Sequence, residues 1–178
     1  MKQVLILLGK ARSGKDTVAD FLVKEFDFKK FVFSSVLENE LKKQGKKVSK
    51  QSMSLLGDEL RKEFGMGIVA SKLMEKISEE EKIVFVGARS VEEVELIKEK
   101  FPQAKLILVE ALKEKRFERR SEMDSDDLKK FHERDLFDEE KKGMQKVFSL
   151  AELKIENNGS LRDLFSKTKA LMYNIFKD

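Results

Sequence analysis

The chain has 178 residues, of which 40% are hydrophobic and 39% are charged, so one folded domain with a substantial core is expected. It contains no cysteine and one histidine, which excludes disulfides and thiolate metal sites and argues against a zinc centre. The 37 basic and 33 acidic residues leave a formal net charge of only +4. Such a mixed surface does not by itself select nucleic acid as the partner.

The first half of the chain alternates short apolar runs with longer amphipathic segments. Strands are expected at Val4–Leu8, Phe31–Ser34 and Ile83–Gly87. A helix follows the first strand, and a helical region of about 36–77, interrupted near glycines, follows the second. The run Val4–Leu8 is too short for a signal-peptide core or a membrane span, so we expect a cytoplasmic protein.

The second half continues the alternation. Ser90 and Glu93 have the spacing of a capping box and predict a helix that ends before Pro102. A fourth strand is expected at Lys105–Glu110, charged helices at about 113–148, a fifth strand at 152–157, and a closing helix from Ser160. Near-continuously apolar strands separated by helices predict a parallel sheet covered on both faces, that is, a single α/β domain over residues 1–178.

A glycine-rich stretch, "GKARSGKD" (Gly9 to Asp16), lies between the first strand and the following helix. This is where a phosphate-binding loop must lie, because its backbone N–H groups and the helix N-terminus together hold the anion. Lys15 would reach the β- and γ-phosphates. The residues expected to contact the donor nucleotide in this loop are Gly9, Ala11, Arg12, Ser13, Gly14, Lys15, Asp16 and Thr17.

Asp16 departs from the usual pattern, in which Ser or Thr follows the lysine and places a hydroxyl on Mg²⁺. A carboxylate is also a hard oxygen ligand, so Asp16 is a candidate metal ligand. The alternative is that Asp16 only caps the helix. Thr17 lies one position late for the usual metal role.

The class of phosphate-loop protein follows from size and from missing motifs. The chain lacks the N-K-x-D and D-x-x-G motifs of GTP switches and is too short for a motor or transporter ATPase. A small kinase remains, in which arginines surround the transferred phosphoryl group. Arg89 follows the third strand, at the sheet edge where α/β proteins bind ligands. Further candidates are Arg61, Arg116, Arg119, Arg120 and Arg134, whereas His132 is expected to be a surface residue.

These stretches resemble known families. "GKARSGKDTVADFL" is similar to the loop of viral-type deoxynucleoside monophosphate kinases and of phosphomevalonate kinases. The rest resembles an archaeal and bacterial family of small P-loop kinases of the dephospho-CoA-kinase-like or adenylate-kinase-related type. The matching stretches are "LGDELRKEFGMGIVASKL", "GARSVEEVELIKEKF", "KRFERR", "SDDLKKFHERD" and "AELKIENNGSLRDL".

The resemblance implies a P-loop three-layer sandwich with a five-stranded parallel sheet in the order 2-3-1-4-5. It implies an acceptor-binding helical insertion at about 35–80 and a lid at about 112–140. It would place Arg61 and Arg89 near the acceptor phosphate, and Ser35 and Arg134 are further candidates for binding the acceptor. Arg116, Arg119 and Arg120 would be lid residues, and Asn157, Asn158 and Gly159 would contact adenine.

Two departures from the family bear on activity. Relatives carry an acidic residue and an arginine after the second strand, where this chain has Ser35 and Glu38, and an Asp where it has Val86. The favoured hypothesis is ATP- and Mg²⁺-dependent phosphoryl transfer to a small phosphorylated acceptor, most simply a nucleoside or deoxynucleoside monophosphate, with Lys15, Asp16, Arg89, Arg116 and Arg119 as the catalytic set. The alternatives are a nucleotide-binding protein without transfer and, least favoured, a nucleic-acid partner of the Lys42–Lys50 cluster. The sequence leaves oligomeric state open.

Overall fold

A computed structural model describes residues 2–119, 127–141 and 143–176; of residues 134 and 137–141 it describes the backbone alone. Five strands form one parallel sheet, with bounds Gln3–Leu8 (β1), Lys29–Val32 (β2), Lys82–Val86 (β3), Lys105–Glu110 (β4) and Leu153–Glu156 (β5). The strand order is β2-β3-β1-β4-β5, which confirms the predicted fold class.

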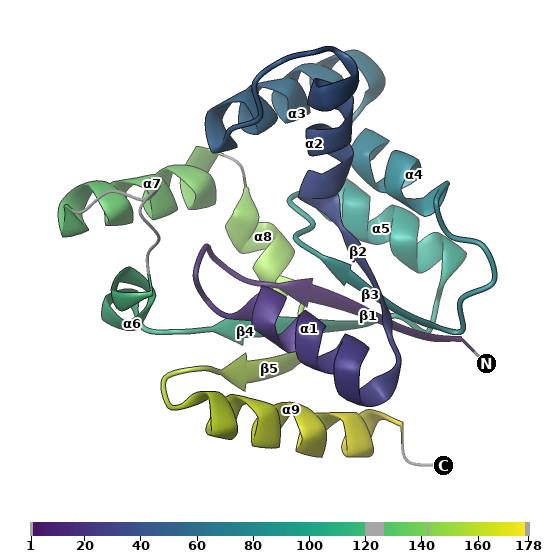
Figure 1. Ribbon diagram of the computed structural model, residues 1–178, viewed down its shortest axis with the longest axis vertical. Helices are drawn as coiled ribbons and strands as arrows, with labels where there is room; N and C mark the ends of the chain where they lie inside the picture. Colours follow the sequence, from purple (N-terminus) through teal and green to yellow (C-terminus); the bar gives the residue numbers. More distant parts are fainter. Residues whose placement is uncertain (1, 120–126, 142, 177–178) are drawn as a thin grey trace.

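Helices alternate with these strands (Figure 1). In the first half they are Lys15–Phe26 (α1), Phe33–Lys43 (α2), Lys50–Phe64 (α3), Ile68–Met74 (α4) and Val91–Lys100 (α5). In the second half they are Lys113–Glu118 (α6), Leu128–Lys141 (α7), Met144–Ser149 (α8) and Leu161–Ile175 (α9). Among the helices described, none is both long and apolar enough to cross a membrane.

The central strand β1 divides the core because its successive side chains point to opposite faces of the sheet. Val4, Ile6 and Leu8 pack with the core residues of α2 to α5 and of α8. Leu5 and Leu7 pack on the other face with α1 and α9. This double coverage explains why β1 reads as an unbroken apolar run.

The second strand differs from its prediction. It covers Lys29–Val32 and not Phe31–Ser34, and Phe33 already begins α2. β2 is an edge strand that pairs only with β3, so its outer positions tolerate lysine. Both Phe31 and Phe33 are buried, one in the strand and one in the helix, and the apolar pattern alone does not separate these cases.

The strands end together at the edge that carries the glycine-rich loop. β1 pairs in parallel with β3 and β4, so the segments after all three strands meet at this edge. Figure 1 shows α2 and α3 and, further along the same end of the molecule, α7 beyond this edge of the sheet. These helices correspond in sequence to the segments expected as acceptor-binding insertion and lid.

Candidate functional site

The glycine-rich loop turns sharply between β1 and α1. Gly9, Arg12 and Gly14 have φ of +153°, +64° and +100°. A Cβ at Gly9 would lie 2.4 Å from the Val109 carbonyl oxygen, so only glycine fits against β4. Gly14 is the N-cap of α1, and no side chain caps the helix there. The first turn of α1 thus begins without the side-chain acceptor that usually occupies a helix N-terminus.

The segment that follows β5 forms hydrogen bonds that hold the glycine-rich loop in place. Asn157, which is buried, donates a hydrogen bond from Nδ2 to the Ser13 carbonyl oxygen at 2.8 Å. Its own N–H donates to the Glu110 carbonyl oxygen at 2.7 Å, so β4, β5 and the loop are tied at one point. Asn158 accepts a hydrogen bond from the Leu112 N–H at 2.8 Å. Gly159 lies close to Asp163, whose carboxylate caps α9 through Ser160.

Three cationic side chains converge at the start of α1. The Lys15 side chain is 18% exposed, and burial lowers the pKa of its amine. The Asp16 carboxylate opposes that shift, and the nearby charges of Arg89 and Arg12 lower the pKa of Lys15 further. A phosphate bound at this amine would offset both the cost of burying its charge and the repulsion from the two arginines.

Asp16 is the acidic residue in the first turn of α1. Its carboxylate, 59% exposed, lies 3.4 Å from the Lys15 amine and 3.8 Å from that of Lys30 on β2. Lys30 also pairs with Asp20 at 2.9 Å. Thr17 is half-buried in the first turn of α1. Asp16 is therefore an accessible carboxylate between two lysines, at the loop position that usually carries a metal-binding hydroxyl.

Arg116 lies inside the protein and not on an open surface. Its guanidinium is 1% exposed, pairs with Asp135 of α7 and donates from Nη1 to the Ala11 carbonyl oxygen at 3.2 Å. Arg119 donates to the Asn157 carbonyl oxygen at 3.0 Å. Of the three arginines predicted for the lid, Arg116 thus contacts the glycine-rich loop, and Arg119 contacts Asn157, which is bonded to that loop. Arg120 lies outside the described residues, as does the side chain of Arg134.

Three of the residues expected at the acceptor side, Arg89, Arg61 and Ser35, have described side chains. Arg89 is exposed at the end of β3. Arg61 pairs with Glu93, with Nη2 and Oε1 2.8 Å apart. Ser35 donates to the Val32 carbonyl oxygen at 2.7 Å in the first turn of α2. Glu38 pairs with Lys42 on the same helix.

A cavity of about 530 Å³ adjoins the loop. Its lining combines the ends of β4 and β5 with α6 and α8 and includes Ser13, Leu112, Arg116, Phe148 and Asn158. Within the described part of the chain, Ser13 Oγ and Arg116 Nε are buried without a hydrogen-bond partner. The size suits a small organic ligand.

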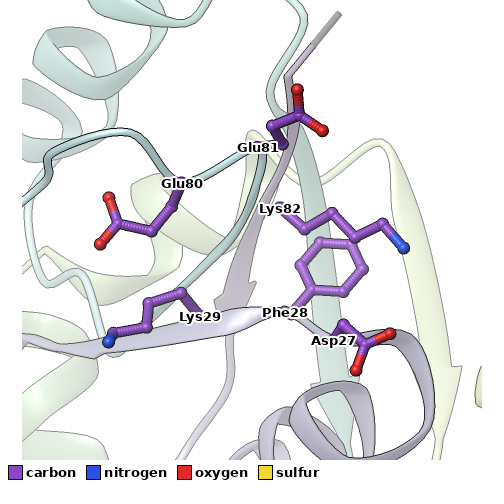
Figure 2. A pocket seen from close by; sticks show the side chains of 6 residues that line it. All are labelled: Asp27, Phe28, Lys29, Glu80, Glu81 and Lys82. Atoms are coloured by element: carbon purple, nitrogen blue, oxygen red, sulfur yellow. The ribbon is translucent and has the colours of Figure 1, made fainter.

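A second hollow, of about 390 Å³, lies at the opposite edge of the sheet, where β2 and β3 begin. Figure 2 shows that its side chains, among them Lys29, Glu80 and Lys82, extend in different directions and do not converge on one point. Lys82 instead donates to the Phe26 carbonyl oxygen at 3.0 Å. We therefore assign the candidate site to the cavity beside the glycine-rich loop.

Comparison with known proteins gives the family of this chain. A family model described as an AAA domain matches residues 8–135, most of the chain. The chain belongs to the AAA domain family. A UPF0200/UPF0201 protein of Archaeoglobus fulgidus is 30% identical to this AAA-domain chain across 99% of it, and the chain spans 57% of that relative's length. A UPF0200 protein of Thermococcus kodakarensis is 28% identical, with 97% of both chains covered.

Solved kinases share the fold of this AAA-domain chain. A shikimate kinase from Bacteroides thetaiotaomicron superimposes with a TM-score of 0.63 over 99% of both chains at 12% identity. A shikimate kinase from Acinetobacter baumannii, in complex with shikimate, gives 0.61 over 100% of this chain and 97% of its own, at 16% identity. At such identities these structures establish the P-loop kinase fold alone and leave the acceptor open.

Three residues of this region escaped the sequence analysis as site residues: Glu93, Asp135 and Lys30. Glu93 reads as the second half of a capping box, and its N–H does donate to Ser90 Oγ at 3.1 Å. Its carboxylate, however, bonds the N–H of Arg89, one residue before the N-cap, and the side chain of Arg61. Asp135 and Arg116 are 19 residues apart, and Glu93 and Arg61 are 32 residues apart. Pairs so distant in the sequence leave no periodic pattern, so only the folded structure reveals them.

Proposed function

We propose that the protein transfers the γ-phosphoryl group of ATP to a small phosphorylated acceptor, most simply a nucleoside or deoxynucleoside monophosphate. The observation that supports this most is the glycine-rich loop between β1 and α1 with Lys15 at its end, where burial, and to a smaller extent the charges of Arg89 and Arg12, lowers the pKa of the Lys15 amine. Such an arrangement is stabilised by a phosphate chain.

The donor would lie along the loop. The backbone N–H groups from Gly9 to Thr17 and the Lys15 amine would hold its phosphates. The nucleoside would enter the cavity of about 530 Å³, which Asn158 lines. Gly159, the next residue in the chain, would lie near the base.

The residues present fit Mg²⁺ as a companion of the phosphates. Among the described residues, no group of three or more potential ligand side chains that could hold a metal is found. Mg²⁺ in such sites is commonly held by one or two carboxylates together with substrate phosphates and water. Asp16 would supply that carboxylate, and the ion would neutralise charge on the phosphates.

The chain's own residues would act by position and charge. The acceptor phosphate oxygen forms a bond to the γ-phosphorus, the bond from that phosphorus to the β–γ bridging oxygen breaks, and ADP leaves. Lys15 would stabilise the leaving phosphates, and Arg89 would bind the acceptor phosphate, to which the γ-phosphoryl group is transferred. Arg116 would fix the loop through Ala11, and Arg119 would contribute positive charge next to Asn157.

A panel of acceptors tests the proposal. ATP labelled at the γ-position would be supplied with Mg²⁺ and with ribo- and deoxynucleoside monophosphates, dephospho-CoA, shikimate or gluconate. Dephospho-CoA covers the dephospho-CoA-kinase-like resemblance, shikimate covers the shikimate kinases that share the fold, and gluconate covers a gluconokinase from Sinorhizobium meliloti that also shares it. We expect transfer to a monophosphate and loss of most activity in Lys15→Ala.

The proposal includes a cytoplasmic location, where ATP is available.

Two outcomes would contradict transfer to a phosphorylated acceptor. Label found only on shikimate or gluconate would move the acceptor to another class. Nucleotide binding without transfer to any compound would favour the alternative of a nucleotide-binding protein, consistent with Ser35, Glu38 and Val86 standing where relatives carry acidic residues and an arginine.

A further inference from the structure

A buried carboxylate links two segments that border the acceptor side of the site. Glu93, on α5, is 0% exposed. Its Oε1 accepts hydrogen bonds from Arg61 Nε at 3.2 Å and Nη2 at 2.8 Å. Its Oε2 accepts the backbone N–H of Arg89 at 2.7 Å. One side chain therefore joins α3, which carries Arg61, to the loop that carries Arg89.

The two oxygens of Glu93 accept hydrogen bonds from different partners, and only a carboxylate can accept at both positions. Both partners are donors, so each oxygen must be an acceptor. An amide in its place would turn one oxygen into an NH₂ group that faces another donor. A negative charge at a fully buried position is retained only when it is paired and hydrogen-bonded, and here Arg61 supplies the pairing charge.

A glycine in α3 leaves space for the contact between Arg61 and Glu93. Gly57 lies one helical turn before Arg61, and a Cβ at Gly57 would lie 2.9 Å from Arg61 Nη1. The glycine leaves room for the guanidinium to fold along α3 toward α5. The Arg61 side chain is only 11% exposed, so most of it is engaged within the protein.

Arg89 differs from Arg61 in its surroundings. Its backbone is fixed by Glu93, whereas its side chain is exposed. Its charge lies near enough to Lys15 to lower the pKa of that amine. Of the two arginines, Arg89 is therefore the one with a guanidinium available to a ligand next to the loop.

We propose that Glu93 and Arg61 are positioning residues that act through Arg89, which binds the phosphoryl group of the acceptor. This rests on the proposed function and refines it: Arg61, predicted from the sequence to contact the substrate, serves instead to set the Arg89 loop. Because the same carboxylate holds α3, a movement of α3 on acceptor binding changes the placement of Arg89.

A double-mutant cycle tests the inference without requiring turnover. The probe is inorganic phosphate, titrated into ADP-saturated protein at constant ionic strength and followed by ³¹P NMR. The variants are Arg61→Met, Arg89→Met and the double variant. Arg162→Met, which removes an exposed arginine of α9, controls for net charge. Arg61→Lys keeps a buried positive charge beside Glu93 and serves if Arg61→Met folds poorly.

In the otherwise wild-type protein, we expect Arg61→Met to weaken phosphate binding about tenfold. A loss of this size is typical of one charge-assisted hydrogen bond. The same change should have less than about a twofold effect in the Arg89→Met background, because a residue that acts through Arg89 has nothing left to position. Arg61→Lys should lie between the wild-type protein and Arg61→Met, and neither change at Arg61 should alter the affinity for ADP.

An equal loss from Arg61→Met in both backgrounds would overturn the inference, since Arg61 would then contact the anion itself. No loss in the parent, or no phosphate binding by ADP-saturated wild-type protein, would also overturn it. The expected pattern together with a negative acceptor panel would leave the inference standing and would remove only the proposed phosphoryl transfer.

Discussion

Replacement of Gly14 by alanine tests whether Asn157 supports the glycine-rich loop. Gly14 has φ +100° and ψ 8°, a left-handed conformation that costs alanine about 1–2 kcal/mol. The added Cβ would also lie 2.2 Å from Asn157 Nδ2. Something must therefore move, and the Asn157 amide is the group in contact.

The size of the effect follows from what holds that amide. Asn157 is buried, and Nδ2 donates to the Ser13 carbonyl oxygen at 2.8 Å. Displacing Nδ2 leaves this carbonyl without its partner, at a cost of about 1–3 kcal/mol. Together with the backbone strain, Gly14→Ala should lower the free energy of unfolding by about 2–5 kcal/mol.

Urea denaturation of Gly14→Ala, Asn157→Ala and the double variant measures this directly. Asn157→Ala already forfeits the hydrogen bond and removes the obstructing amide, so Gly14→Ala should cost only about 1–2 kcal/mol in that background. The two single losses should thus exceed the loss in the double variant by about 1–3 kcal/mol. Strictly additive losses would refute the reasoning that the amide is what Gly14 accommodates.

Three further predictions concern the charged groups of the site. Asp135→Asn leaves the buried Arg116 guanidinium without its counter-charge and should lower the free energy of unfolding by about 3–5 kcal/mol in urea denaturation; a loss under about 1 kcal/mol would show that the pair is not the main support of Arg116. Burial lowers the pKa of Lys15 and a bound phosphate raises it again, so ADP binding should take up protons at pH values between the lowered pKa and the ordinary value of 10.5. Calorimetry in buffers of different ionisation enthalpy should detect this uptake in the wild type and not in Lys15→Met, and equal uptake by both would assign it elsewhere. Asp16→Asn should narrow the gap between ADP affinities measured with and without Mg²⁺, because the carboxylate both repels phosphate and binds the ion; Asp20→Asn, which also alters a partner of Lys30, should leave that gap unchanged.

The strands were predictable where burial on both faces made them uniformly apolar. β4 was predicted with its observed bounds, Lys105–Glu110, and β1 and β3 to within one residue. The edge strand β2 was misplaced by two residues because half of its surface faces away from the core. The strand order came from the resemblance of the motifs and was confirmed. Apolar patterns alone say that a sheet is parallel and do not give its order.

The candidate site was predictable where its residues follow one another in sequence. The loop from Gly9 to Asp16 carries its own spacing signal, and its place between β1 and α1 fits it. The arginines were recognised only as positive charges near strand ends. Whether an arginine faces a ligand or a buried carboxylate depends on partners far along the chain, Asp135 for Arg116 and Glu93 for Arg61. Nothing local in the sequence marks such a partner.

The central claim is that the glycine-rich loop and Lys15 hold the phosphates of a nucleotide. Calorimetric titration of the protein with ATP and Mg²⁺, beside Lys15→Met and the exposed-surface control Lys169→Met, tests it most directly. We expect one ATP per chain for the wild type and the control, and an affinity at least about tenfold lower in Lys15→Met, because a charge-assisted contact is lost. Equal affinity in Lys15→Met, or no binding by the wild type, would contradict it.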